Sequence, residues 1–173
     1  MKYLLVAFIA LFVFTSNAQN KVLVKHVKDA GKYSKDVLTY AENLYENIED
    51  ALDAVNYEEA RFYVEQSVYE LENLQASTTY VQDELLEISK IDDDNGGVDI
   101  KLKSGKVEDK CLLIQTYSNT LFTYLNNALL TATIADLLMQ FGAAKNTCDN
   151  IISETQRVIQ LEDELLKMIV PPK

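Results

Sequence analysis

Proline, glycine and tryptophan are scarce in this sequence. Among its 173 residues there is no Trp, and there are only two Pro and five Gly. Both prolines, Pro171 and Pro172, come at the C-terminal end, so none interrupts the chain earlier. An internal proline removes a helical hydrogen bond, and glycine weakens a helix. Their scarcity therefore favours long, uninterrupted helices and an all-α protein.

Histidine is scarcer still, because His26 is the only one. A ferritin-like di-iron site needs two Glu-x-x-His motifs, and an attached haem needs Cys-x-x-Cys-His. Neither motif occurs, and the metalloprotease, nucleophile-elbow and P-loop patterns do not occur either. The lysine and glycine after His26 are out of step with the motif of phosphotransfer domains. We therefore expect no enzymatic activity and interpret His26 as a helix-surface residue.

Positive charge is also in short supply, and the net charge is −11. Nucleic acid and anionic membrane surfaces repel such a chain, so we expect neither as a partner. Five lysines nevertheless follow one another at spacings of three and four: Lys21, Lys25, Lys28, Lys32 and Lys35. They could form a basic face for an acidic partner. We prefer pairing within the chain, because residues 46–95 hold fifteen acidic and two basic groups. A hairpin at residue 56 would pair Lys28 with Glu84, Lys25 with Glu87, and Lys21 with Asp92.

The longest apolar run lies at the N-terminus, in "MKYLLVAFIALFVFTSNAQN". Lys2 supplies a short positive region, residues 3–14 are apolar, and Ser16-Asn17-Ala18 is a cleavage signature. We predict a signal peptide over residues 1–18 and a single mature domain over 19–173, in the periplasm or outside the cell. The run is shorter than the roughly 20 apolar residues of a membrane span. No later segment is apolar enough to span a bilayer.

Apolar residues recur at alternating spacings of three and four along the rest of the chain. This pattern is typical of helices that pack nearly parallel or antiparallel. The first seam runs from Val27 to Val55 with only Ser34 polar, the second from Ala60 to Ile88, and the third from Val107 to Met139. A new phase starts at Ala144 and ends with Leu165 and Met168.

The breaks in this pattern predict the turns. We expect one turn at Asn56, one near Gly142-Ala143, and an acidic loop between the second and third helices. The predicted helices cover residues 22–55, 57–90, 107–141 and 145–169. Short turns make neighbours antiparallel, so the prediction is an up-down-up-down four-helix bundle. The alternating segment "VDIKLK" (98–103) is expected to be extended against the bundle end.

The two cysteines, Cys111 and Cys148, occupy seam positions. With the predicted boundaries each would begin a helix, and they would lie roughly 40 Å apart along the axis. A disulfide needs Cα atoms within about 7 Å of each other. We therefore expect two buried thiols. The alternative is a hairpin turn near Leu129-Leu130, which the capping pattern "TIAD" from Thr133 would favour.

Tyrosines gather on the first predicted hairpin, at positions 33, 40, 45, 57, 63, 69 and 80. Tyrosine commonly edges a core with its hydroxyl in water, and it is also enriched at binding surfaces. We expect core edging for most of them.

The segment "IDDDNGGVDIK" (91–101) raises the question of a calcium loop. The oxygen ligands available are Asp92, Asp93, Asp94, Asn95 and Asp99. Calcium loops take ligands at positions 1, 3 and 5, with glycine at 6 and an acid at 12. One ligand is missing in either register, and position 12 is Leu102 or Lys103. A weak calcium site is therefore an alternative to a plain connection, and no other cofactor is expected.

Together these features indicate an exported, soluble helical bundle. We expect it to act by protein–protein interaction, as an adaptor, scaffold or chaperone-like factor. The alternative is a carrier of a small molecule or of calcium that uses the bundle end or the acidic loop. An enzyme is disfavoured because no constellation of catalytic residues is visible.

Overall fold

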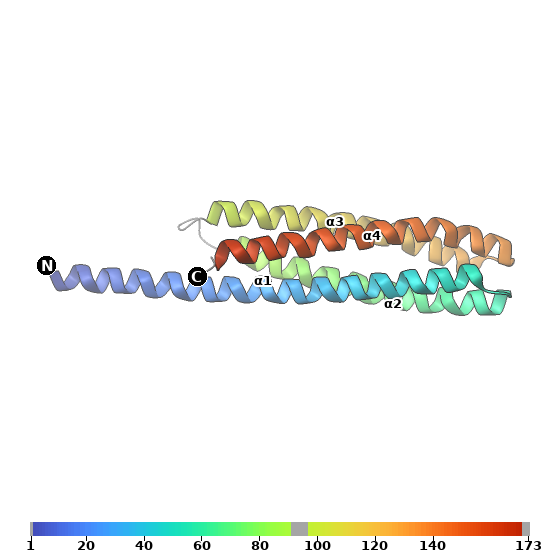
Figure 1. Cartoon of the computed structure of the whole chain (residues 1–173), viewed down its shortest axis with the longest axis horizontal. Coiled ribbons are helices and arrows are strands. Elements are labelled where there is room, and N and C mark those ends of the chain that lie inside the picture. Colours follow the sequence, from blue (N-terminus) through green and yellow to red (C-terminus); the bar gives the residue numbers. More distant parts are fainter. Residues whose placement is uncertain (1, 91–96, 171–173) are drawn as a thin grey trace.

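The computed structural model describes residues 2–90 and 97–170, with the backbone alone for residues 2–19. This part of the chain forms four α-helices and no strand: α1 (Lys2–Asp53), α2 (Tyr57–Ser89), α3 (Gly97–Leu130) and α4 (Ile134–Ile169). Figure 1 shows them side by side and antiparallel in chain order. α1 and α3 each pack against both α2 and α4, whereas α2 and α4 face each other diagonally with little contact. The predicted up-down-up-down bundle is confirmed.

The core consists of the predicted seams. Every seam position of α2 from Ala60 to Ile88 is buried. Every seam position of α3 from Val107 to Ala128 is buried as well. In α1 the seam is buried from Val27 to Ala51, and Ser34 lies in the core with it. Each helix therefore presents one apolar stripe to the bundle axis, and burial of these stripes drives the helices together.

α1 begins at Lys2, whereas the sequence predicted a helix from residue 22. Its N-terminal part projects beyond the other three helices (Figure 1), and Leu23 is the first buried residue among the described side chains. The packed part of α1 therefore starts where it was predicted. Among the described residues, no helix is long and apolar enough to cross a membrane. The signal peptide over residues 1–18 stays a prediction.

The first turn matches its prediction, because Asn56 caps α2. The Asn56 side chain accepts a hydrogen bond from the Glu59 backbone N–H at 2.9 Å. Glu59 in turn accepts one from the Val55 backbone N–H at 3.0 Å. Two of the unpaired backbone donors at the helix start are satisfied by this exchange.

The predicted start of the third helix at residue 107 was wrong. α3 begins at Gly97, so "VDIKLK" is helical rather than extended. Ile100 packs against the core and Ser104 is buried, which continues the seam of Val107 backwards by two turns. Ser104 is polar, so the apolar pattern alone did not show this continuation.

The predicted turn at Gly142-Ala143 was also wrong, because the chain turns between Leu130 and Ile134. Thr133 caps α4, with its hydroxyl accepting from the Asp136 backbone N–H at 3.2 Å. The Tyr57 hydroxyl donates to the Thr131 carbonyl at 2.6 Å and ties this turn to the start of α2. Apolar spacing continues across the turn by coincidence: Met139 is exposed, and the α4 seam starts at Leu137. The "TIAD" cap was the correct signal.

This correction changes the reason for the free cysteines but not their state. Cys111 and Cys148 are both buried free thiols. They do not lie at opposite ends of the bundle. Counted along each helix from the turn between Leu130 and Ile134, their distances from that turn differ by about five residues, or roughly 7.5 Å along the axis. The Cys148 thiol donates to the Ala41 carbonyl of α1 at 3.2 Å. Burial raises the pKa of each thiol to about 12, so both are protonated at neutral pH.

We predict that neither cysteine reacts with an alkylating reagent in the folded protein, because the thiolate is the reactive form. Both should react once the protein is denatured, without any reductant. Mass spectrometry of the labelled protein measures this directly. Labelling that requires prior reduction would show a disulfide and contradict the orientation of Cys148 towards α1.

Candidate functional site

The predicted calcium ligands fall mostly outside the described residues. Asp92, Asp93, Asp94 and Asn95 lie there, while Asp99 is exposed in the first turn of α3. Within residues 2–90 and 97–170, no three His, Cys, Asp or Glu side chains gather as metal ligands would. The calcium site stays a prediction.

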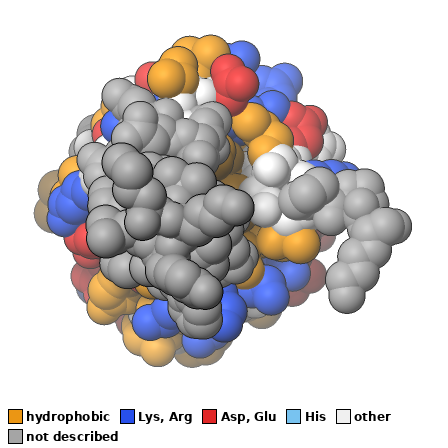
Figure 2. Space-filling model, turned by 90° about the vertical axis from the view of Figure 1, so that its left-hand side faces the viewer, with side chains coloured by type: hydrophobic (Ala, Val, Ile, Leu, Met, Phe, Trp, Pro, Cys, Tyr) orange, Lys and Arg blue, Asp and Glu red, His pale blue; other side chains and the backbone are white. Residues whose placement is uncertain are grey.

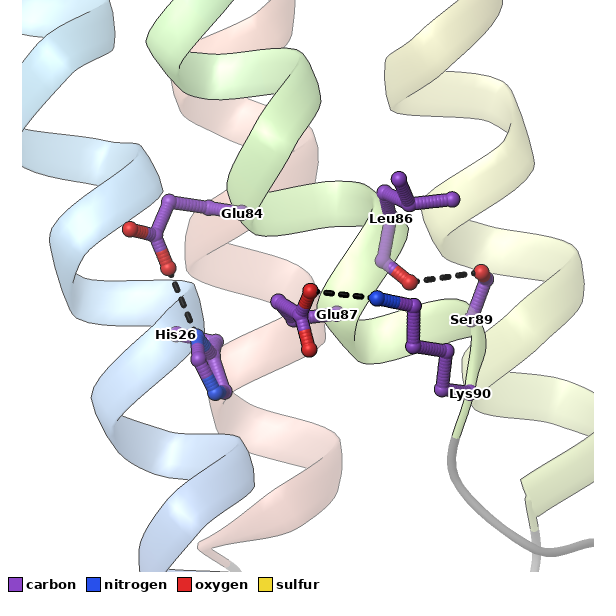
Figure 3. A network of polar contacts seen from close by, with 6 residues as sticks. All are labelled: His26, Glu84, Leu86, Glu87, Ser89 and Lys90. Atoms are coloured by element: carbon purple, nitrogen blue, oxygen red, sulfur yellow. Dashed lines mark hydrogen bonds and ion pairs between the residues drawn. The ribbon is translucent and has the colours of Figure 1, made fainter.

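The expected pairing of Lys28 with Glu84 and of Lys25 with Glu87 was wrong. Glu84 Oε2 accepts from His26 Nδ1 at 2.6 Å, and Glu87 pairs with Lys90 of its own helix (Figure 3). The His26 side chain is only 21% exposed, so it joins α1 to α2 rather than lying on the surface. Lys28, Lys32 and Lys35 instead line a pocket between α1 and α4. Figure 2 shows Lys and Arg side chains among apolar ones around the end from which α1 projects.

The tyrosines divide between two roles. Tyr33, Tyr40, Tyr45, Tyr57 and Tyr63 are half-buried against the core, which confirms core edging for them. Tyr69 and Tyr80 are instead 61% and 51% exposed. They share the outward face of α2 with Phe62, which is 56% exposed.

These three side chains lie on one line, because their separations of seven and eleven residues are near-multiples of the helical turn. We call Phe62, Tyr69 and Tyr80 the aromatic row. Tyr80 also stacks on Tyr33 of α1, with ring centroids 5.1 Å apart. The helix that carries the row holds eight acidic residues and one basic residue. Glu58, Glu65 and Glu72 are exposed beside it.

The most unusual polar group of the described residues is Glu162, on the core side of α4. It is only 3% exposed. Its Oε1 accepts a hydrogen bond from the Ser34 hydroxyl of α1 at 2.8 Å. Its Oε2 is buried and has no hydrogen-bond partner. A buried polar atom without a partner is costly, so this atom calls for an explanation.

Burial governs the ionisation of Glu162. Removal from water raises the pKa of this carboxyl to about 8, against smaller opposing effects of the Ser34 hydrogen bond and the Lys35 charge. At neutral pH the group is therefore largely protonated and neutral. With Oε1 accepting from Ser34, we assign the proton of the neutral carboxyl to Oε2, which makes Oε2 a hydrogen-bond donor.

Glu154, two turns earlier on α4, shows the contrast. It is also nearly buried, but its Oε2 lies 2.9 Å from Lys110 Nζ and its Oε1 accepts from Arg157 at 2.5 Å. Oε2 of Glu154, like Oε2 of Glu162, is buried and makes no hydrogen bond, but Glu154 is neutralised by two cations. Oε2 of Glu162 has neither a hydrogen bond nor an ion pair among the described residues.

Glu162 was not predicted as a site residue, although the spacing of the α4 seam places it in the core. The α4 seam steps from Val158 to Leu165, and the position between them at the four-and-three spacing is 162. Ile169, not Met168, then ends the seam, and Met168 is exposed. An acidic residue at a seam position opposite Ser34, the one polar residue of the first seam, marks a polar layer in the core.

Comparison with protein-family models, with curated proteins and with solved structures finds no match for this chain. The aromatic row and Glu162 are the features of the chain that bear on its function.

We predict that Glu162→Gln makes the protein more stable than the wild type at pH 8 and above. The folded carboxyl has a pKa above its ordinary value, so the folded state holds a proton that the unfolded state releases. The contribution of Glu162 to the free energy of unfolding is therefore largest below about pH 4.5, where the carboxyl is protonated in both states. It declines by about 1.4 kcal/mol per pH unit as the pH rises to about 8.

Urea unfolding of both proteins between pH 5 and pH 9 measures this difference, and effects of other titrating groups cancel in it. Glutamine keeps an acceptor for Ser34 and carries no charge. A difference between the two proteins that does not change with pH would show that Glu162 is ionised in the fold.

Proposed function

We propose that this protein acts by protein–protein interaction, as an adaptor, scaffold or chaperone-like factor in the periplasm or outside the cell. The N-terminal sequence supports the location. The aromatic row on α2 carries the proposal for the interaction, because it places three large side chains in water on a face that covers no other described helix. Exposed aromatic side chains are among the residues from which interaction hot spots are made.

The charge around the row selects the partner. Acidic side chains flank it, and those at 58, 65 and 72 point into water. A partner with apolar residues at helical spacing and lysine or arginine beside them would match the row and its flanks together. We therefore propose that the row receives a basic amphipathic helix of another protein. The acidic surface speeds the approach of such a helix, and the aromatic side chains hold it.

We predict that replacing Phe62, Tyr69 and Tyr80 together by alanine abolishes this binding. A designed amphipathic peptide of leucine and lysine serves as the probe, and isothermal titration measures its affinity. Each hot-spot aromatic accounts for about tenfold in affinity, so the triple variant should lose at least about a hundredfold. Binding by the wild type should weaken as salt is raised.

The matched control replaces three exposed apolar residues of α3 and α4, namely Leu112, Phe122 and Met139, by alanine. It should bind the peptide as the wild type does. A photo-crosslinker at position 69 should capture a discrete protein in the native compartment, and one at position 122 should not. The proposal fails if both triple variants lose affinity equally, or if a leucine and glutamate peptide binds as well.

A further inference from the structure

A pocket of about 250 Å³ lies between α1 and α4, on a different side of the bundle from the aromatic row. Glu162 and Gly31 face each other across it. Its apolar walls are Val27 of α1 and Ile159 and Leu166 of α4. Pockets for drug-sized ligands measure roughly 300–1,000 Å³, so this one suits a smaller molecule.

The unpartnered Oε2 of Glu162 gives the pocket its polar anchor. A Cβ atom at position 31 would lie 3.7 Å from Oε2, so Gly31 and this oxygen lie next to each other where both residues line the pocket. Oε2 itself is buried, and a turn of the Glu162 carboxyl toward the pocket would bring this donor, which no described residue satisfies, to an acceptor atom of a ligand.

The charged side chains that line the pocket determine whether it favours an anionic or a cationic ligand. Lys28, Lys32 and Lys35 line the α1 side, and Asp163 is the one ionised acid opposite them, since Glu162 is largely neutral. The lining therefore carries a net positive charge in a chain whose net charge is −11. A cationic ligand would meet three ammonium groups of like charge, whereas an anion would be attracted.

We propose that this pocket binds a small organic anion, a monocarboxylate with a short apolar body. One carboxylate oxygen accepts a hydrogen bond from Glu162 Oε2 once the carboxyl turns toward the pocket beside Gly31. A lysine ammonium pairs with the other oxygen, and the apolar body lies against Val27, Ile159 and Leu166. Two carboxyl groups that share one proton in this way form a strong, charge-assisted hydrogen bond. This binding function is independent of the aromatic row.

The pH dependence of binding follows from the groups that face Glu162. These are Lys28, Lys32 and Lys35 of α1, the neutral thiol of Cys111 on α3, and Asp163 of α4. Glu162 changes charge near pH 8. Once it ionises, it loses its donor and repels an anion. Affinity should therefore fall about tenfold per pH unit above pH 8.

The test is a titration of the isotope-labelled mature protein with hexanoate, followed by NMR. Hexylamine and inorganic phosphate serve as comparison ligands. Hexanoate should shift the resonances of pocket residues at pH 6.5, hexylamine should not, and phosphate should bind more weakly because it has no apolar body.

Gly31→Ala provides the sharpest variant, because its methyl group would lie against Oε2 at an ordinary contact distance and hinder the turn of the carboxyl toward the pocket. Alanine also strengthens a helix relative to glycine, so the variant should fold. It should weaken hexanoate binding at least about tenfold. Gly142→Ala, where an added Cβ meets nothing within 4 Å, should leave binding unchanged.

The lysines are tested in the same way. Replacing Lys28, Lys32 and Lys35 by glutamine should weaken binding, whereas replacing Lys21 and Lys25, which are outside the pocket, should not. The proposal is overturned if hexanoate does not bind, if hexylamine or phosphate binds as tightly, or if Gly31→Ala binds as well as Gly142→Ala. Absence of binding would mean that water satisfies the Oε2 donor in solution, or that Glu162 is ionised and pairs with a lysine of the pocket.

Discussion

The bundle depends on the packing of α1 against α4. The other three neighbouring pairs of helices are joined by turns or by the segment between α2 and α3, so chain connectivity already holds them close. α1 and α4 are joined by no direct connection and meet only through their side chains. Their seam must therefore be specified by its own contacts. Those contacts include the Cys148 thiol on the Ala41 carbonyl, Ser34 on Glu162, and Lys145 on Glu49 at 2.6 Å.

The polar layer at Ser34 and Glu162 has a cost and a consequence. A buried carboxyl loses its hydration, which costs free energy, and an apolar residue at position 162 would avoid this cost. The Ser34 bond joins α1 to α4 through one oxygen, and we infer that it helps to fix the register of the two helices, as single polar residues do in helical bundles. The other oxygen is left to the pocket. The same residue thus specifies the closing contact of the bundle and supplies the donor on which ligand binding depends.

The two proposed surfaces use opposite properties of the chain. The aromatic row lies on the strongly acidic α2 and attracts cations, while the pocket lies against the lysines of α1 and attracts anions. The two surfaces lie on different parts of the bundle, since α2 and α4 are diagonal to each other and make little contact. Occupancy of one surface need not disturb the other, so each can be studied through its own variants.

The sequence predicted the bundle because helical spacing of apolar residues is a direct consequence of core burial. It also predicted the turn at Asn56, where spacing and capping chemistry agree. It failed where the two signals disagreed: apolar spacing ran on through residues 131–133, and the local cap at Thr133 determined the turn. It failed again where a seam position is polar. Ser104 concealed the first turns of α3, and Glu162 was passed over because an acid does not belong to an apolar pattern.

Pairing of surface charges was predicted least well. Several lysines and glutamates lie at similar spacings, and exposed ion pairs differ by too little energy for spacing to select one. Glu84 accordingly pairs with His26, a contact that the lysine register did not suggest. The pocket could not be foreseen for a related reason. It requires Gly31 and Glu162, distant in sequence, to meet across the one seam that no turn defines.

We infer that the α1–α4 seam buries a protonated carboxyl group at position 162. A pH titration of the Glu162 side-chain carbon by NMR in the folded protein tests this inference, with the resonance assigned from Glu162→Gln. We expect a midpoint at about pH 8. A midpoint near the ordinary value of 4.5 would show that water reaches this carboxyl, and would contradict both the seam and the pocket built on it.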